Sequence, residues 1–456
     1  MAMAVSVVKM SEPLESLRRA VALCDGFERL NRHGRVLIKP NVAYGMRLPP
    51  YGITTTTSIL EGLIQLLAER GCSDISIAEG CVEILGFDTK KAYARTQIDK
   101  LAKRYGARLL DLNRGPFRQV DLGGVKVQIA KAALETDFLI NVPVLKTHSQ
   151  TNVSLGFKNL KGCLSPASKV KFHVTKRLNH LIYLLNEVLR SDLTVIDGTY
   201  MLENGPEIVL GTAHRKNLII AGQDVFACDV VGATILGIDP SEVGYLREFA
   251  EAHGRSLNMD AIQIKGEEDI DALREQLSWK ADVAKELLAP AGITGLSVPY
   301  PGESLCSRCY ATLGVALVAF TGENSNRDFG DAAIYSGGEL EQETRRQKTI
   351  LYGNCAIKNN SLKPCTSMKV KGCPPRLTDT LFALCKSLLS RPRALRVMSV
   401  ALLKLAGVGI GIYDYSLPKW RRYRSGTFDK RHFALSRHRP TEIDSKSKQL
   451  GLPRTT

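Results

Sequence analysis

The sequence predicts an α/β fold, with a mainly parallel sheet covered by helices on both faces and a small cysteine-rich metal-binding segment after it. Over the first 265 residues, short β-branched runs alternate with helical patterns, which is typical of βαβ units. The composition of the 456 residues, 44% hydrophobic and 24% charged, is that of an ordinary globular protein. Disordered, coiled-coil and collagen-like classes are therefore excluded.

The alternation predicts the elements of the sheet domain in order along the chain. We expect strands at residues 36–39, 74–78, 108–112, 120–122, 125–129, 138–142, 194–196 and 217–221. We expect helices at residues 58–70, 89–105, 177–190, 225–236, 241–253 and 273–288. Pro290, Gly292 and Gly295 then break the pattern, which predicts a domain boundary near residue 290.

Three regions follow from this boundary: an α/β domain over residues 1–290, a cysteine-rich segment over 291–376, and apolar helices with a basic tail over 377–456. In the second region, few helical or strand-like pieces are long, so we expect something other than a core to hold it together. In the third, Pro392 separates helices expected at 377–389 and 394–405. We expect the polar end from Lys419 onward to be loosely ordered.

The positive charge is concentrated at the C-terminal end. Of a net charge of +16, residues 386–456 supply 16 Lys and Arg against 4 Asp and Glu. Such a tail can bind phosphate, anionic lipid or an acidic protein, or it can simply be solvated. Residues 395–412 are apolar and flanked by arginines. This pattern is compatible with two interpretations, peripheral contact with a membrane and packing in the protein core. Nucleic acid is not indicated, because no recognition motif accompanies the charge.

No stretch is apolar enough over about 18 residues to predict a membrane span, and no export signal precedes the first strand. We therefore expect a cytoplasmic protein. Disulfides are then not expected, and grouped thiols point to metal binding or catalysis.

Five of the 11 cysteines lie between residues 306 and 373. The preferred ligands of a metal centre are Cys306, Cys309, Cys355 and Cys373, and Cys365 competes with Cys355. Four thiolates can complete the shell of a 4Fe-4S cluster or of tetrahedral zinc. Zinc ribbons usually supply two close cysteine pairs and this chain has one, so a 4Fe-4S cluster is favoured and zinc is the alternative.

Polar groups follow the predicted strands of the α/β domain, where ligands bind in open sheets. Lys39 and Asn41 end one strand. The densest group follows the strand at residues 138–142 and interleaves with Gly and Asn, which indicates a site for a negatively charged ligand. It comprises Lys146, Thr147, His148, Lys158, Lys161 and His173.

Carboxylates follow in Asp197 and Glu203 and, further on, in Asp224 and Asp229. They can serve acid–base chemistry opposite the lysines or simply form ion pairs. No Gly-x-Gly-x-x-Gly, Walker A or nucleophile-elbow motif stands where the order of strand and helix would require it. The standard nucleotide-binding and serine-hydrolase interpretations therefore lose support.

These motifs together resemble the domain of unknown function 362 family over roughly residues 35–265. The matching motifs are Lys39-Pro40-Asn41, Ile77-Ala78-Glu79-Gly80, the run from Asn141 to His148, the run from Lys158 to Gly162, Asp197-Gly198 and Gly205-Pro206. The resemblance implies the fold but no reaction. It also implies an association with iron-sulfur proteins of anaerobes, some of which carry a ferredoxin module. This chain lacks the Cys-x-x-Cys-x-x-Cys run of such a module and has instead scattered cysteines ending in Gly372-Cys373-Pro374-Pro375.

A fainter similarity is to the nickel-pincer lactate racemase family. His148, Lys158 and His173 repeat the order of a histidine, a lysine ten residues later and a further histidine. The similarity implies that Lys158 and His173 hold a cofactor and that His148 moves a proton.

Three hypotheses for the function remain. The first is a redox protein, either an oxidoreductase or an electron-transfer protein. Its 4Fe-4S cluster would exchange electrons with an anionic substrate or cofactor in the α/β lobe or with an electron donor or acceptor protein. The ligand-binding residues would be Lys39, Asn41, Lys146, Lys161, Asp197 and Glu203, and His148, Lys158 and His173 would be catalytic. The second is a racemase-like, non-redox enzyme with a structural metal. The third is a maturation protein that carries a metal or cofactor to a partner.

Overall fold

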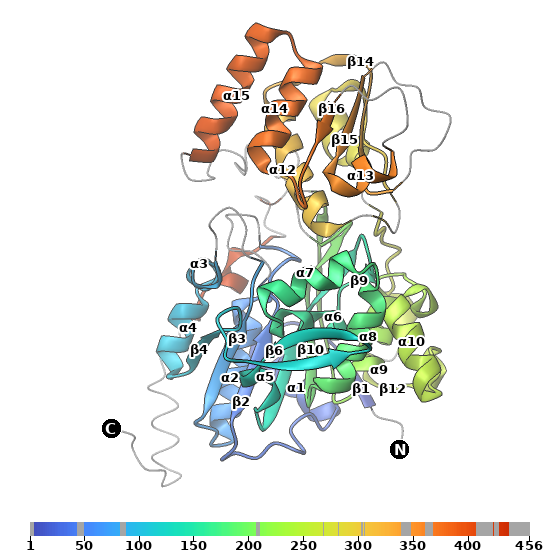
Figure 1. The fold of residues 1–456 in the computed structure, drawn as a ribbon. Helices are drawn as coiled ribbons and strands as arrows, with labels where there is room; N and C mark the ends of the chain where they lie inside the picture. Colours follow the sequence, from blue (N-terminus) through green and yellow to red (C-terminus); the bar gives the residue numbers. More distant parts are fainter. Residues whose placement is uncertain are drawn as a thin grey trace.

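The described residues of the computed structural model form three sheets (Figure 1). A 10-stranded sheet and a two-stranded one lie within residues 4–266, and a four-stranded one lies within residues 294–370. The structure describes residues 4–42, 50–82, 88–206, 210–267, 269–280, 282–301, 304, 306–338, 348–360, 368–406, 423 and 428–436. No helix of these residues is both long and apolar enough to span a bilayer. Cys365 and most of the basic tail lie outside them.

The larger sheet has the strand order β12-β1-β11-β10-β7-β2-β3-β4. Five neighbouring strands, from β10 to β4, are parallel, whereas β11 runs antiparallel to both β10 and β1. The bounds are β1 Ala4–Lys9, β2 Val36–Pro40, β3 Ile75–Glu79, β4 Arg108–Asp111, β7 Phe138–Val142, β10 Leu193–Glu203, β11 Thr212–Gly222 and β12 Gln263–Gly266. The predicted mainly parallel sheet is confirmed.

Helices cover both faces of this sheet, as predicted. On one face, a buried cluster includes side chains of α1 (Pro13–Leu23), α2 (Thr57–Glu69) and α4 (Ile98–Tyr105). On the other, a second buried cluster includes side chains of α8 (Leu178–Val188), α9 (Val225–Ile235) and α10 (Gly244–His253). The same face carries α5 (Lys131–Leu134) and the hairpin of β5 (Phe117–Leu122) and β6 (Val125–Ala130).

Several predicted elements differ in their limits. The helix expected at 89–105 is two helices, α3 (Thr89–Arg95) and α4, because Gln97 adopts a left-handed backbone conformation with φ of 59°. The helix expected at 273–288 is wrong, because the described residues of this range contain only the end of α11 (Ile270–Leu273) and a π-helical turn (Ala284–Leu288). The strands β10 and β11 extend well beyond the predicted cores because they pair with each other along most of their length. The sequence analysis missed β1.

The four-stranded sheet belongs to a small α/β domain whose buried core also includes Tyr51, Ile53, Tyr200 and Leu202 of the first domain. Its four strands are parallel in the order β13-β14-β15-β16, comprising Thr294–Ser297, Asp328–Ser336, Lys348–Tyr352 and Met368–Val370. The helices are α12 (Ser307–Gly322), α13 (Gly353–Asn359), α14 (Leu377–Leu388) and α15 (Arg391–Ala406). We expected few long elements here and something other than a core to hold them together. The second part of this expectation is wrong, because α12 and β14 are long and apolar side chains of both are buried.

The chain returns to the first domain near its end. Residues 428–436, which we expected to be loosely ordered, pack on the α/β domain. Phe433 stacks on Tyr200 and contacts Tyr51 edge-on. Ser436 donates its backbone N–H (2.8 Å) and hydroxyl (3.0 Å) to the buried carboxylate of Glu61. Aromatic burial and this hydrogen-bonded carboxylate hold the segment in place.

Candidate functional site

The site begins at the carboxyl ends of three neighbouring parallel strands. Lys39 lies near the end of β2 and pairs in register with Asn141 near the end of β7. On the other side of β2, β3 ends at Glu79. This edge of the sheet is where ligands bind in open α/β folds, as the sequence analysis expects.

A buried ion pair forms the floor of the site. Lys39 Nζ lies 2.8 Å from Glu79 Oε1, and the two side chains are 0% and 3% exposed. Glu79 also accepts hydrogen bonds from two backbone N–H groups at 2.9 and 2.8 Å. A Cβ on Gly162 would lie 2.6 Å from Lys39 Nζ, so the loop that carries Lys161 packs on this pair only with glycine there.

Three asparagine side chains connect the strands above this pair. Asn41 donates to Asn159 Oδ1 (3.2 Å), and Asn159 donates to Asn141 Oδ1 (2.8 Å). Lys146 Nζ donates to Asn41 Oδ1 (2.6 Å) and to the carbonyl of Ile53 (3.1 Å). The ammonium group of Lys146 is thus held by neutral oxygens.

Strand β8 (Val144–His148) carries two buried titratable side chains. The pKa of Lys146 is lowered to about 7, mainly by burial. The charge of Glu79 acts in the opposite direction, and the charge of Lys39 adds to the lowering. Burial also lowers the pKa of His148 well below its ordinary value, and nearby lysines add to this effect. His148 Nδ1 accepts the backbone N–H of Gln150 at 3.0 Å. His148 is therefore neutral at pH 7, with its proton on Nε2.

Two short turns carry the remaining lysines. Lys158 lies on α6 (Gly156–Asn159), Lys161 on the 3-10 turn Leu160–Cys163, and His173 on α7 (Pro166–Val174). Lys161 Nζ lies 2.6 Å from His173 Nε2. Burial lowers the pKa of Lys161 to about 7 and that of His173 well below its ordinary value. The Nδ1 atom of His173 is buried without a hydrogen-bond partner among the described residues.

Repulsion between cations acts throughout this group, which we call the lysine cluster: Lys146, His148, Lys158, Lys161 and His173. Burial first, and then the charges of Lys161 and Lys146, lower the pKa of Lys158 well below its ordinary value. An anion placed among these side chains would relieve both effects, because it supplies the opposite charge in a partly desolvated place.

Asp229 on α9 anchors the turn that presents Lys158. Its carboxylate accepts the backbone N–H groups of Gly156 (2.6 Å) and Phe157 (3.0 Å), the first residues of α6. Burial raises the pKa of Asp229 to about 8, although these two hydrogen bonds lower it. Asp229 thus satisfies the helix N-terminus that would otherwise be buried without acceptors.

Two predicted ligand-binding carboxylates have contacts elsewhere. Asp197 accepts the backbone N–H and hydroxyl of Thr56 at 2.7 and 2.8 Å, at the start of α2. Glu203 lies 3.3 Å from His214 Nε2 and accepts the backbone N–H of Ser278. Among the described residues, neither carboxylate contacts a lysine of the cluster, and their assignment as ligands stays a prediction.

The four preferred cysteines come from three elements of the C-terminal domain. Cys306 and Cys309 lie at the start of α12, Cys355 lies on α13, and Cys373 follows β16. A hydrogen bond with Cys306 raises the pKa of Cys309, as do burial and the charges of Cys306, Cys373 and Cys355. The same hydrogen bond, seen from Cys306, lowers the pKa of that thiol to about 6. The four thiols therefore interact electrostatically and form what we call the thiol group.

Backbone turns bring the loops of Cys355 and Cys373 together. Asn354 donates its backbone N–H to the carbonyl of Gly372 (3.0 Å), and Gly372 donates its own to Asn354 Oδ1 (2.8 Å). Gly353, with φ of 89°, passes close to Cys309: a Cβ there would lie 3.4 Å from the sulfur. No three His, Cys, Asp or Glu side chains of the described residues stand in an arrangement that could hold a metal ion.

The thiol group faces the lysine cluster. Cys306 raises the pKa of Lys161, whereas Arg308 lowers the pKa of both Lys161 and His173. The hydroxyl of Tyr300 donates to the carbonyl of Ser149, next to His148 in the sequence. The structure thus brings together the two groups that the sequence analysis identifies in separate regions.

Two residues at this junction were missed. Lys169 donates to the carbonyl of Gly80 (2.6 Å) and to Asn113 Oδ1 (2.7 Å), and burial lowers its pKa to about 8. Lys169 precedes His173 by one helical turn, a spacing that could have identified it. Arg308 carries no comparable signal apart from its position between Cys306 and Cys309.

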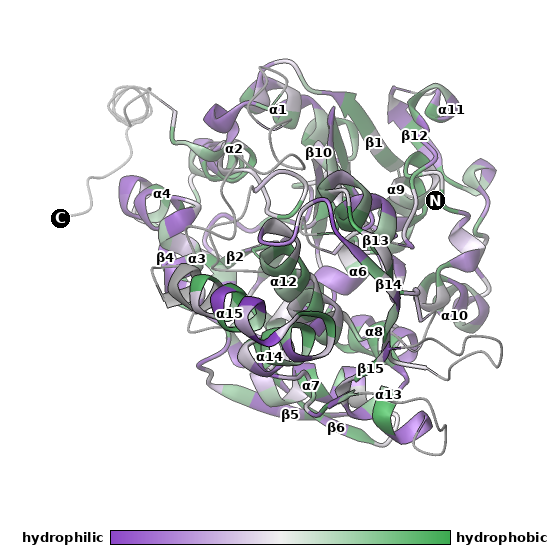
Figure 2. Ribbon diagram, turned by 90° about the horizontal axis from the view of Figure 1, so that it is seen from above, coloured by the Kyte–Doolittle hydropathy of each residue, from purple (hydrophilic) through white to green (hydrophobic). Residues whose placement is uncertain are grey.

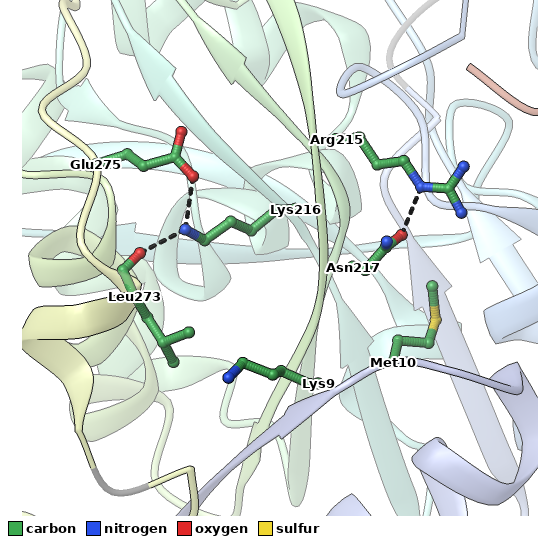
Figure 3. Close-up of a pocket in the computed structure, with 7 residues that line it drawn as sticks. All are labelled: Lys9, Met10, Arg215, Lys216, Asn217, Leu273 and Glu275. Carbon is green, nitrogen blue, oxygen red and sulfur yellow. Dashed lines mark hydrogen bonds and ion pairs between the residues drawn. The ribbon is translucent and has the colours of Figure 1, made fainter. Parts of the chain in front are cut away.

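A shallow pocket of about 400 Å³ lies elsewhere, between β1, β11 and the segment after α11 (Figure 3). Lys216 there bonds Glu275 (2.6 Å), so its charge is compensated. None of the predicted site residues lines this pocket. Its lining residues are Lys9, Met10, Arg215, Lys216, Asn217, Leu273 and Glu275.

The known proteins that are similar to this chain include a relative from a strain of Synechocystis and a solved structure. The chain is 28% identical over 240 residues to the thylakoid-associated protein sll1697 of Synechocystis sp.. The matched region covers 50% of this chain and 72% of that protein. The chain is also similar to the lactate racemase apoprotein of Thermoanaerobacterium thermosaccharolyticum, with 13% identity, a TM-score of 0.37, and coverage of 88% and 91% of the two chains. We draw nothing about the reaction from a likeness of this extent.

The model of one protein family matches residues 36–234. The matched region contains the ends of β2, β3 and β7 and all five residues of the lysine cluster. It also contains every motif on which the sequence resemblance rests. Residues 36–234 thus match the model of the family described as domain of unknown function (DUF362), as the sequence motifs predict.

Proposed function

We propose that this protein is a redox protein in which a 4Fe-4S cluster, bound by Cys306, Cys309, Cys355 and Cys373, exchanges electrons with an anion held by the lysine cluster. One observation carries the proposal. The charge of Cys306 acts on Lys161, so the thiol group and the lysine cluster adjoin each other. Zinc in the same thiol group is the alternative metal.

The chemistry of the donors supports the cluster. Four thiolates are the usual ligands of a 4Fe-4S cluster, and these four already interact with one another. Cys355 and Cys373 are exposed, and Cys306 and Cys309 are half-buried, so the thiol group lies at the surface of its own domain. When bound, the cluster would supply one-electron transfer. The chain supplies the ligands and the neighbouring positive charges.

The charges of the lysine cluster support an anionic ligand. Lys146 and Lys161 have pKa values lowered to about 7, so each takes up a proton readily when an anion arrives. The unpartnered Nδ1 of His173 offers a hydrogen bond beside them. His148, neutral with its proton on Nε2, can donate that proton to a bound ligand.

The proposal is tested by iron and sulfide analysis of protein purified without oxygen. We expect about four irons and four sulfides per chain. Cys373→Ser is expected to abolish the visible absorbance and to lower stability, because cluster binding contributes folding free energy. The side chain of Cys373 is exposed, so serine there disturbs no core.

Cys385→Ala is the matched control, because Cys385 is a buried thiol of α14 in the same domain. It should leave the iron content unchanged. Zinc in place of iron would make the site structural, and fully coloured Cys373→Ser protein would refute the ligand assignment.

A non-redox enzyme is the second candidate. The observation that favours it is the group of lysines and histidines whose pKa values burial lowers, which suits proton transfer near pH 7. In that case His148, Lys158 and His173 would act on the ligand, and turnover would not depend on the oxidation state of the metal.

The location of the protein is also a proposal. All ten described cysteines are free, which fits the reducing cytoplasm. The relative is called thylakoid-associated, and contact with a membrane surface is compatible with a cytoplasmic protein.

A further inference from the structure

The helical hairpin of α14 and α15 exposes apolar side chains beside basic ones at the end of the molecule away from β2 (Figure 1). We propose that this hairpin docks on a bilayer surface that contains anionic lipids. The inference is independent of the proposed redox function and concerns a different part of the C-terminal domain.

Two large apolar side chains of the hairpin face solvent. Phe382 on α14 is 47% exposed, and Leu395 on α15 is 62% exposed. They are two of the four exposed large hydrophobic residues in the described part of the chain, the others being Val82 and Val188. Only two residues separate α14 from α15, so Phe382 and Leu395 lie within two turns of the same connection.

Basic side chains surround these two residues. Lys386, Arg391 and Arg396 are exposed, and no ion pair compensates their charges within the described residues. Lys386 Nζ lies 5.6 Å from the centre of the Phe382 ring. Helix α15 contains four basic residues and no acidic one, and hydrophilic and hydrophobic residues alternate along it (Figure 2).

Arg393 shows what a structural arginine looks like in the same helix. It donates to Asn324 Oδ1 (3.2 Å) and to the carbonyl of Glu323 (3.3 Å) at the end of α12. Val397 is buried beneath the helix. One side of α15 thus fixes the helix to its domain, and the side with Leu395 and Arg396 remains open.

The combination of side chains favours a bilayer over other anionic partners. Phe and Leu insert at the boundary of headgroups and acyl chains, while Lys and Arg bind the phosphates above them. A nucleic acid would use the positive charges but would gain little from Leu395. The hairpin therefore matches a bilayer surface, in which negatively charged headgroups cover an apolar interior.

Co-sedimentation of the full chain with vesicles tests the proposal. We expect binding to vesicles of phosphatidylcholine with phosphatidylglycerol at low salt, and little binding to phosphatidylcholine alone. Arg391→Gln combined with Arg396→Gln should lower the partition coefficient roughly thirtyfold. Phe382→Ser and Leu395→Ser should each weaken binding without changing the charge.

The controls remove the same charge, or an exposed apolar side chain, elsewhere in the chain. Lys100→Gln with Lys103→Gln changes two exposed lysines of α4, and Val188→Ser changes an exposed side chain of α8. Both should bind like the unmodified chain, as should a chain that ends at Ser436.

Three results with vesicles alone would overturn the proposal. They are no binding of the unmodified chain to either vesicle, equal binding of the hairpin variants, and loss of binding on removal of residues 437–456 alone. Displacement from vesicles by a DNA duplex at equal phosphate concentration would also contradict it, because a nucleic acid would then be the better partner.

Discussion

At the residue scale, Lys146 is a buried amine whose charge depends on what lies beside it. It is 2% exposed and donates only to neutral oxygens among its described hydrogen-bond partners. Burial lowers its pKa to about 7. At neutral pH the anion-free protein therefore holds this lysine near the midpoint of its titration, and a bound anion would shift it to the charged form.

This gives a prediction for the pH dependence of anion binding. Sulfate keeps a constant charge near neutral pH, so any change in its affinity comes from the protein. We expect the affinity to be highest below pH 7 and to fall as the pH rises above it, by up to tenfold per pH unit for each proton taken up. Lys146→Gln should weaken binding and reduce the pH dependence, as measured by calorimetry.

Stability without anion should change in the opposite sense. The folded-state pKa of Lys146 is below its ordinary value, so between about pH 7 and 10 the unfolded chain binds more protons. This lysine therefore makes the free energy of unfolding rise with pH over that range. Lys100→Gln, at an exposed position, is the control. A sulfate affinity that changes neither with pH nor in the Lys146→Gln variant would refute an anion site here.

At the scale of elements, α6 is a single helical turn that depends on a residue far away in the sequence. It has four residues and presents Lys158 to the cluster. Short helices do not form by themselves, and here the carboxylate of Asp229 on α9 satisfies the first two N–H groups. The position of Lys158 therefore depends on the packing of α6 against α9.

Removal of Asp229 should affect both stability and the site. Asp229→Ala leaves two buried N–H groups unsatisfied and should lower the free energy of unfolding by about 1–3 kcal/mol, measured by urea denaturation. Sulfate affinity should fall as well, because Lys158 and Lys161 follow the displaced turn.

Asp229→Asn should restore part of both properties, since its amide oxygen can still accept a hydrogen bond. Asp88→Ala removes an N-cap from α3 and is the control: it should cost about 1 kcal/mol and leave sulfate affinity unchanged. Unchanged sulfate affinity in Asp229→Ala would show that this anchor does not position the lysines.

Elements with strong periodicity were predictable, and those fixed by tertiary contacts were not. The strands at residues 36–39 and 138–142 are buried apolar runs, and the sequence analysis predicts them nearly as they are. The break between α3 and α4 at Gln97 depends on a backbone conformation that no local pattern specifies. The helical pattern at residues 273–288 does not form one helix, because the backbone N–H groups of Glu275 and Leu277 donate to carbonyls at the end of α9 instead.

At the scale of the whole molecule, two α/β domains meet at the carboxyl edge of the larger sheet. The individual groups were predictable: the lysine cluster from its density after one strand, and the four cysteines from their clustering. Their proximity was not, because Lys161 and Cys306 are far apart in the sequence and only the packing of the two domains brings them together. Arg308 likewise affects the pKa of His173 only because the two domains pack together.

The central claim is that the thiol group binds a 4Fe-4S cluster beside the lysine cluster. The midpoint potential of this iron-sulfur centre, measured on protein purified without oxygen, tests the claim most directly. At about pH 6 Lys161 is protonated, and its charge would stabilise an electron added to a cluster held by the thiol group. We predict a reducible 4Fe-4S signal whose potential falls in Lys161→Gln by tens of millivolts and stays unchanged in Lys100→Gln. Protein without a reducible cluster, or a Lys161→Gln potential equal to that of the unmodified chain, would contradict the account.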